Sequence, residues 1–411
     1  MHERYIDIES CFYSLIKVVQ AEAHAMEVKS DLSNVPTDTA IPDESVVLVL
    51  QGGGALGAYQ AGAYEALNEA GIEPDWIAGI SIGAINGVLI AGNPKKDRIS
   101  RLRKFWETAS AGLTAIYPFD DPSMRVIFNE ANASAAAMFG IPGFFSPRSY
   151  VPFFGVGQDP AQVSFYDTAP LIRTLNTLVD FDFLHSASAP RLSVGAVDIE
   201  NGNFAYFDTH ADQITARHIL ASGALPPGFP PVKIDGRYYW DGGLVSNTPL
   251  NYIMEYAGTD KDMCIFQVDV FSATGTLPRN IAETTEREKD IRFSSRTRFN
   301  SDHVRLLHEL RYATRKLIDR LPPELIDDEV RRLRNLSREE SVTVAHIIRR
   351  DARYETASKD YEFSRQSVEE HWELGRNDVH RGLKTKAWTN RTRSQRGFKV
   401  FDLTRNQDKQ S

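Results

Sequence analysis

Residues 46–92, VVLVLQGGGALGAYQAGAYEALNEAGIEPDWIAGISIGAINGVLIAG, decide the fold class of this chain. Residues 46–50 form a short, wholly apolar run, as in strands that are buried on both faces. An alanine-rich, helix-forming segment follows over residues 58–70, with Gly71 placed to end it. Residues 75–80 then predict a second strand and residues 82–92 a second helix. Strand, helix, strand and helix within about fifty residues predict a parallel α/β sheet.

The glycine-rich loop after the first strand has two incompatible interpretations. Gly52, Gly54 and Gly57 spell G-x-G-x-x-G, the pattern of a dinucleotide-binding turn. That site needs an acidic residue at the end of the second strand, to hold the ribose hydroxyls. Asp75 has a suitable spacing but precedes the second strand, on the wrong edge of the sheet. We therefore favour an oxyanion hole, in which glycines let backbone N–H groups approach a developing negative charge.

A candidate nucleophile follows the second strand. Residues 79–83 read GISIG, a G-x-S-x-G motif between a predicted strand and a predicted helix. A sharp turn would expose the Ser81 hydroxyl at the carboxyl edge of the sheet, while Gly79 and Gly83 avoid collisions with neighbouring backbone. Because parallel strands end at one edge, we expect Ser81 to lie beside the glycine-rich loop.

Two kinds of proton acceptor are open for this serine. Asp241 follows three aromatic residues and precedes Gly242 and Gly243; aromatic surroundings should desolvate its carboxylate, raise its pKa and make it a better base. A plain Asp-Gly turn is the structural alternative for this stretch. The other acceptor would be a histidine in a Ser-His-Asp hydrolase. Five histidines follow Asp241, all in a charged region away from glycine-rich loops: His303, His308, His346, His371 and His380.

Composition excludes several classes of protein. The 411 residues carry a net charge of −8, which argues against a general nucleic-acid binder. Cys11 and Cys264 are the only cysteines and lack metal-ligand spacing, so we expect no disulfide framework and no thiolate metal site. The N-terminus lacks the pattern of a signal peptide, and no run approaches the ~18 apolar residues of a membrane span. We expect a cytoplasmic protein; peripheral membrane contact and the oligomeric state stay open.

The chain divides into four segments by composition. Residues 1–45 contain an N-terminal segment and a linker, and residues 46–275 form the α/β domain. Residues 276–390 predict a mostly helical, charged extension, and we expect residues 391–411 to be a disordered tail.

The stretch from about 115 to 165 has no clear period. It is rich in Phe, Pro, Ala and Gly, which predicts an irregular segment. Its phenylalanines favour either a loop packed on the core or an apolar wall or lid over a pocket: Phe144, Phe145, Phe153 and Phe154.

Taken together, the three motifs resemble those of the patatin-like phospholipases. The glycine-rich loop, the GISIG motif and Asp241-Gly242-Gly243 match that family in order and spacing. Residues 221–250, with their proline-rich turn and Asn247, are similar to the family's approach to its aspartate. The resemblance covers residues 46–270. It implies a three-layer α/β/α fold with a mainly parallel central sheet, and a Ser–Asp dyad in which Ser81 is the nucleophile and Asp241 the base.

The resemblance also implies an oxyanion hole and a substrate class. The hole would be formed by the glycine-rich loop and the residue after the nucleophile: Gly52, Gly53, Gly54, Ala55, Leu56, Gly57 and Ile82. No metal or organic cofactor would be needed, and the partner would be a lipid or another hydrophobic ester. Patatin-like loops often carry Arg or Lys where this chain has Leu56. That departure weakens a phospholipase assignment more than a hydrolase assignment.

We therefore predict a serine acyl hydrolase of the lipase or phospholipase type that acts through an acyl-enzyme. The rivals are a Ser-His-Asp esterase, a non-catalytic lipid-binding or scaffolding relative and, more distantly, a nucleotide-binding protein. Residues 359–378, KDYEFSRQSVEEHWELGRND, resemble an uncharacterised extension that follows some bacterial patatin-like domains, and this second resemblance implies no chemistry.

Overall fold

The computed structural model describes residues 44–117, 121–151, 159–257, 261–350 and 354–405, without the side chains of residues 122 and 295–301. All of these residues belong to one compact unit. Cys11, Phe153 and Phe154 therefore lie outside the described residues, as does nearly all of the predicted N-terminal segment.

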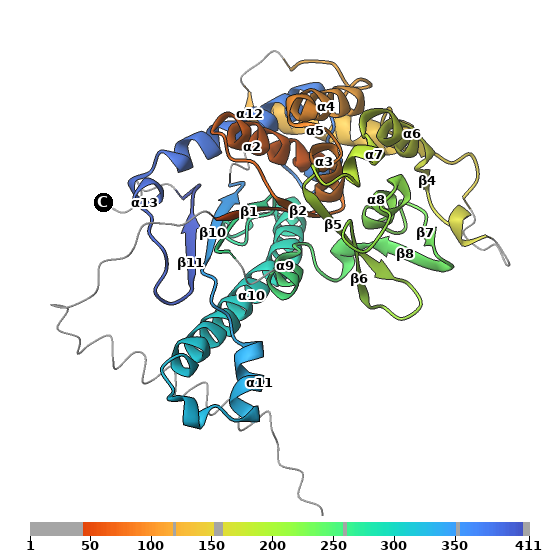
Figure 1. Cartoon of the computed structure of the whole chain (residues 1–411). Coiled ribbons are helices and arrows are strands. Elements are labelled where there is room, and N and C mark those ends of the chain that lie inside the picture. Colours follow the sequence, from red (N-terminus) through yellow and green to blue (C-terminus); the bar gives the residue numbers. More distant parts are fainter. Residues whose placement is uncertain (1–43, 118–120, 152–158, 258–260, 351–353, 406–411) are drawn as a thin grey trace, which may run out of the picture. The chain divides into compact units, whose positions relative to one another are not determined.

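A central sheet of nine strands organises the described part of the chain (Figure 1). Its strands are β1 (Ser45–Leu50), β2 (Trp76–Ile80), β5 (Arg191–Asp198), β6 (Phe204–Asp208), β7 (Val232–Ile234), β8 (Arg237–Asp241), β9 (Met263–Asp269), β10 (Val342–Ile348) and β11 (Phe398–Asp402). The order is β11-β10-β9-β1-β2-β5-β8-β7, with β6 also paired to β5. The run from β11 to β5 is parallel, whereas β6, β7 and β8 pair antiparallel. The predicted α/β fold with a mainly parallel sheet is confirmed.

Helices and short turns make up most of the remaining described structure. The α-helices are α2 (Gly57–Glu69), α3 (Ile82–Ala91), α4 (Lys95–Ala109), α5 (Pro122–Phe139), α6 (Ala169–Leu178), α7 (Phe181–Leu184), α8 (Ala216–Ser222), α9 (Leu250–Tyr256), α10 (Ile281–Ile318), α11 (Asp328–Leu336), α12 (Arg365–Leu383) and α13 (Lys386–Thr389). The 3₁₀ turns are η1 (Gly54–Leu56), η2 (Pro160–Gln162), η3 (Gly242–Leu244), η4 (Pro323–Leu325) and η5 (Lys359–Tyr361). A small two-stranded sheet joins β3 (Ser146–Pro147) to β4 (Tyr166–Asp167).

Strand β1 lies in the middle of the sheet and is covered on both faces. Successive side chains of a strand point to opposite faces. Leu48 and Leu50 join the core cluster that includes α2 and α3, whereas Val47 and Val49 join a second cluster with side chains of α9 and α10. Figure 1 shows α2, α3 and α12 on one side of the sheet and α9 and α10 on the other. Burial on both faces explains why residues 46–50 of this strand are all apolar.

The extension after residue 276 is part of the same sheet. Helices follow residue 280 as predicted, but β10 pairs in parallel with β9, and β11 pairs with β10. Helix α12 packs along α2 so closely that a side chain at Gly62 would overlap the Trp372 carbonyl, and one at Gly375 the Tyr59 carbonyl. The expectation of a disordered tail from residue 391 was wrong for residues 398–402, which form β11. The composition of the tail gives no sign of this strand, because its partner β10 lies far away in the sequence.

The stretch from 115 to 165 contains a helix that the prediction of an irregular segment missed. Helix α5 begins after Asp121, whose carboxylate accepts hydrogen bonds from the N–H groups of Ser123 and Met124. Pro122 occupies the first position, and Gly140, with φ 79°, ends the helix. Both end signals were present in the sequence. We missed the helix because its alanine-rich body has no strong apolar period.

Candidate active site

Ser81 lies at the turn between β2 and α3, at the carboxyl end of β2. Its backbone has φ 55° and ψ −123°, a conformation that non-glycine residues rarely adopt and that costs roughly 1–3 kcal/mol. The Ser81 N–H donates to Ser222 Oγ at 3.0 Å, which ties the turn to α8. A strained strand-to-helix turn of this kind is the setting in which a G-x-S-x-G serine acts as a nucleophile.

The glycines on either side of Ser81 permit close backbone packing. A Cβ at Gly79 would overlap the Gly83 carbonyl, and a Cβ at Gly83 would overlap the Leu50 carbonyl at the end of β1. Helix α3 can therefore start directly against the ends of both strands. This steric fit is the physical reason for the spacing of the motif.

Asp241 ends β8 and is 3% exposed. Its Oδ1 accepts a hydrogen bond from the Gly243 N–H at 2.7 Å. Burial raises the pKa of this carboxyl to about 6, and hydrogen bonds from the Gly243 N–H and the Ser81 side chain lower it. Asp241 and Ser81 both line the pocket described below. Gly242 packs against the Gly195 carbonyl of β5.

The glycine-rich loop passes beside Ser81. A Cβ added to Gly52 would lie 3.2 Å from the Ser81 Cβ. Asn247 holds the loop through two hydrogen bonds. Its side-chain Nδ2 donates to the Gly52 carbonyl at 3.0 Å, and its backbone carbonyl accepts from the Gly52 N–H at 3.3 Å. Within the described part of the chain, the N–H groups of Gly53, Gly54 and Ile82 donate no hydrogen bond. Because Gly53, Gly54 and Ile82 also line the pocket described below, their N–H groups are available to bind an anion there.

The structure separates the seven predicted oxyanion-hole residues into two groups. Gly52, Gly53, Gly54 and Ile82 line the pocket described below. Ala55 and Leu56 are completely buried in the core instead, and Gly57 packs against Ile82 and Trp106 at the start of α2. Position 56 therefore faces the core of this protein, which accounts for an apolar residue there.

One pocket collects the candidate catalytic groups. It encloses about 830 Å³ of empty space, part of it open to solvent, and Ser81, Asp241 and the glycine-rich loop line it. Its other walls are mostly apolar, formed by Ile85, Phe144, Phe145, Leu171, Leu220, Leu225, Phe229, Phe271, Phe293 and Phe363. Phe144 and Phe145 pack in the core and also line the pocket. Both interpretations of these residues, a loop packed on the core and an apolar pocket wall, therefore apply.

The five histidines of the alternative Ser-His-Asp scheme are all described, and none lines this pocket. His308 is buried with its Nε2 near the Glu340 carbonyl, and His380 contacts Glu69. Burial lowers the pKa of His371 well below its usual value. The geometry gives the histidine scheme no support.

The extension supplies part of the pocket, which the sequence prediction missed. Phe293 comes from α10, and Asp360, Tyr361 and Phe363 come from η5 and the residue pair that follows it. The sequence signal was the stretch KDYEF at residues 359–363, which carried a resemblance but no assigned role.

Among the described residues, no cluster of three His, Cys, Asp or Glu side chains is suited to hold a metal ion. No helix in the described ranges has the length and apolar character needed to cross a membrane.

Several known proteins are similar to parts of this chain. The lysophospholipase NTE1 of Cryptococcus neoformans var. neoformans is 25% identical over 249 residues, or 59% of this chain and 12% of that protein. The lysophospholipase nte1 of Aspergillus terreus is 29% identical over 249 residues, covering 58% of this chain and 13% of that protein. The chain thus spans about an eighth of the length of these relatives.

Two solved structures show weaker likeness. VipD from Legionella pneumophila has 15% sequence identity and a TM-score of 0.31, covering 81% of this chain and 68% of that one. Full-length ExoU from Pseudomonas aeruginosa, in complex with SpcU, has 17% identity and a TM-score of 0.25, covering 64% and 52%. At these TM-scores we draw nothing from either.

Two family models match the chain directly. A model described as patatin phospholipase matches residues 291–395, within the extension. A model described as patatin-like phospholipase matches residues 48–254, half of the chain, and includes the glycine-rich loop, Ser81 and Asp241. The chain therefore belongs to the patatin-like phospholipase family.

Proposed function

We propose that this protein hydrolyses carboxylic esters of lipids through a Ser81–Asp241 dyad and an acyl-enzyme. The observation that carries the proposal is the content of one pocket. A strained serine, a buried carboxylate and three residues whose N–H groups donate no hydrogen bond within the described structure all line one pocket, and the other walls of that pocket are largely apolar. The family and the lysophospholipase relatives support a lipid ester as the substrate.

In the first half of the reaction, Ser81 Oγ attacks the ester carbonyl carbon while its proton passes to the Asp241 carboxylate. The carbonyl oxygen becomes an oxyanion, and the N–H groups of Gly53, Gly54 and Ile82 are available to bind it. When the tetrahedral intermediate collapses, the bond to the leaving alkoxide breaks. Asp241 returns its proton to that oxygen, so that the free alcohol leaves and the acyl group stays on Ser81.

In the second half, a water molecule takes the place of the alcohol. Asp241 accepts a proton from the water as its oxygen attacks the acyl-enzyme, and the same three amides bind the second oxyanion. Collapse breaks the bond to Ser81 Oγ, which recovers its proton from Asp241. The products are a fatty acid and the regenerated enzyme.

The environment of Asp241 suits both halves. With a pKa of about 6, the carboxyl is mostly ionised at pH 7, yet it is a stronger base than an exposed aspartate. Burial is the cause, so the same apolar walls that would hold an acyl chain also adjust the base. No Lys, Arg or His is among the described residues that line the pocket, so we expect neutral leaving alcohols to suit it best.

The test compares single substitutions in the full-length chain. Ser81→Ala and Asp241→Asn should each reduce the hydrolysis of a medium-chain nitrophenyl ester by about 10⁴-fold or more, as losses of catalytic nucleophile or base do in other serine hydrolases. The exposed Ser188→Ala is the control and should leave turnover unchanged. A fluorophosphonate probe should label the wild type at Ser81 and leave Ser81→Ala unlabelled. Near-wild-type turnover by either dyad variant would refute the proposal.

A second comparison identifies the class of lipid that is cleaved. We expect total lipid extract incubated with the wild type, but not with Ser81→Ala, to release free fatty acid, measured by lipidomics. Monoacylglycerol and lysophosphatidylcholine with the same acyl chain separate a neutral ester from a lysophospholipid. Release from neither lipid, with the nitrophenyl ester still cleaved, would leave an esterase that does not act on lipids and would remove the lipid part of the proposal.

A further inference from the structure

The extension contacts the glycine-rich loop through backbone. Gly54 has φ 54°, and a Cβ at that position would overlap the Asp360 carbonyl oxygen of η5. Turn η5 therefore packs directly on η1, the turn that carries one of the three free amides. Asp360 itself also lines the pocket. Any shift of η5 is transmitted to Gly54 without a flexible side chain between them.

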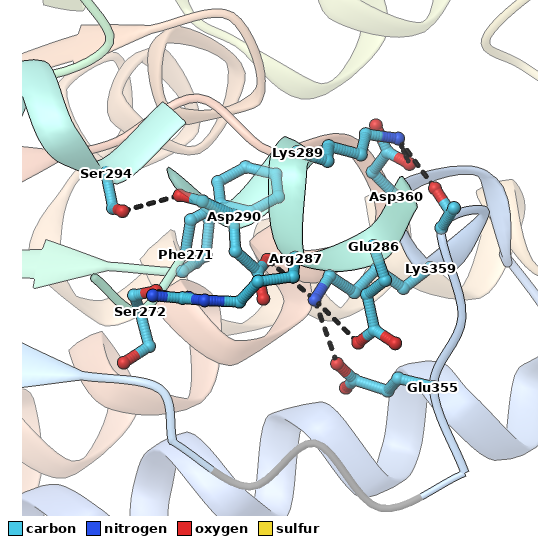
Figure 2. A network of polar contacts seen from close by, with 12 residues as sticks. Phe271, Ser272, Glu286, Arg287, Lys289, Asp290, Ser294, Glu355, Lys359 and Asp360 are labelled. Carbon is cyan, nitrogen blue, oxygen red and sulfur yellow. Dashed lines mark hydrogen bonds and ion pairs between the residues drawn. The ribbon is translucent and has the colours of Figure 1, made fainter. Parts of the chain in front are cut away.

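Turn η5 is in turn held against α10 by largely buried charges of opposite sign (Figure 2). The Asp360 carboxylate forms an ion pair with Lys289, whose Nζ also donates to the Ala357 carbonyl at 2.8 Å. Lys359, the residue before Asp360, is 6% exposed. Its Nζ contacts three carboxylates: Asp290 at 2.8 Å, Glu286 at 3.2 Å and Glu355 at 3.5 Å.

These pairs specify one register between α10 and η5. Lys289 and Asp290 of α10 are adjacent residues of opposite charge, and they contact Asp360 and Lys359, which are also adjacent and of opposite charge. Successive residues of a helix point about 100° apart, so a slide or rotation of α10 would separate both pairs. Buried ion pairs add little net stability, because desolvation offsets their attraction, but such pairs can specify a unique arrangement.

Helix α10 also reaches the residue before the glycine-rich loop. Phe293 stacks on Phe271 with ring centroids 5.0 Å apart, and its carbonyl accepts from Gln51 Nε2 at 3.4 Å. Gln51 is completely buried, and its Oε1 accepts from the N–H groups of Val270 and Phe271 at 2.7 and 3.0 Å. The loop is thus held at both ends, at Gln51 and at Gly54, by contacts that lead to α10.

We infer that Lys289 and Asp360 are positioning residues for the oxyanion hole: their ion pair holds η5 against Gly54 and so sets the direction of the loop amides. The inference rests on the proposed function, because it assigns those amides to the oxyanion. It gives the extension a role in catalysis. Neither residue carries a bond-making step in the proposed reaction.

The test uses the full-length chain and a nitrophenyl ester. A misplacement of about 1 Å can cost ~10²-fold in rate, so Lys289→Met should lower kcat by about tenfold to a hundredfold with KM changed less than about threefold. Asp360→Asn, which keeps the shape but loses the charge, should lower kcat by a smaller factor in the same direction. Lys289→Arg keeps the ion pair and should recover most of kcat. Arg292→Met, which breaks the exposed Arg292–Glu288 pair on the same helix, is the matched control and should match the wild type.

Rates are expressed per active site, counted by the end point of fluorophosphonate labelling, and circular dichroism checks the fold. The initial labelling rate should fall with kcat in Lys289→Met while the end point stays at one probe per chain. The inference would be overturned if Lys289→Met and Asp360→Asn both keep the wild-type kcat, if they change only KM, or if both lose the fold. Ser81→Ala is assayed in parallel: if it keeps turnover, the proposed function fails, whereas an inactive Ser81→Ala beside a fully active Lys289→Met refutes the positioning role alone.

Discussion

The two sides of the pocket are built in different ways. The motif side, from β1, β2 and β8, depends on close backbone packing: because Gly79 and Gly83 have no side chains, main-chain atoms of β1, β2 and α3 can touch. The extension side, from α10 and η5, depends mainly on side chains, with phenylalanine rings lining the pocket and largely buried ion pairs between α10 and η5, although the Asp360 backbone also contacts Gly54. Backbone packing tolerates no added atom, whereas side-chain packing can readjust. We therefore expect substitutions on the motif side to act mainly on rate and those on the extension side to act through position and fit.

The largest effect should come from removing the extension side altogether. A chain that ends at residue 275 loses β10, which pairs with β9, and α12, which covers α2. It would expose a buried strand edge and an apolar helix face, so we expect aggregation and no measurable ester hydrolysis. Expression yield, circular dichroism and turnover are the measurements. A folded, truncated chain that keeps a tenth or more of wild-type kcat/KM would show that the two sides are separable.

A single added methyl group tests the contact between Gly54 and the Asp360 carbonyl without removing the extension. Gly54→Ala places a Cβ against the Asp360 carbonyl and forces alanine into φ 54°, so kcat should fall about a hundredfold. Gly202→Ala is the matched control, because Gly202 has φ 70° but no atom within 4 Å of its added Cβ. Both variants carry backbone strain, and only the first should lose turnover. Equal turnover in the two would mean that the contact at Gly54 has no part in catalysis.

The pH dependence tests the motif side. Burial raises the pKa of Asp241 to about 6, and the base acts only when ionised. Therefore kcat/KM should be constant above about pH 7 and fall tenfold per pH unit below about 6. The measurement is kcat/KM for a nitrophenyl ester between pH 4.5 and 8, with the fold checked at each pH. A limb near pH 4, the value of an exposed aspartate, would contradict the buried environment.

On the extension side, a ring facing the pocket should affect fit more than chemistry. Phe293→Ala removes one apolar wall and its stacking on Phe271, so long acyl chains lose contact area and short ones lose little. We expect kcat/KM to fall roughly threefold to tenfold for a twelve-carbon ester and less than twofold for a four-carbon ester. Equal losses for both esters would contradict a contact between this ring and the acyl chain.

The smallest effect concerns stability. Because folding raises the pKa of Asp241 above its ordinary value of 3.8, ionisation of this group opposes folding. Its favourable contribution is complete below about pH 3.8 and is lost as the pH rises through about 6. Asp241→Asn cannot ionise, so its Tm should exceed that of the wild type by a few degrees at pH 8, and the difference should shrink at pH 5. A variant that melts below the wild type at pH 8 would contradict this sign.

Much of the fold was readable because its signals are local. The apolar run of β1 and the helices α2 and α3 all follow from residues adjacent in sequence. Strand β11 and helix α5 were missed for two reasons. The former is defined by a distant partner strand, and the latter has helix end signals but a weak period.

The same division holds for the candidate site. From the sequence alone came Ser81, Asp241 and the glycine-rich loop, because each sits in a short motif at a predictable end of a strand. Only the tertiary structure decided which of the seven predicted residues line the pocket, and that Leu56 faces the core. It also decided that α10 and η5 close the pocket. Charged side chains such as Lys289 and Lys359 look alike in a sequence, since a buried ion pair and a solvated one use the same residues and differ only in what the fold places around them.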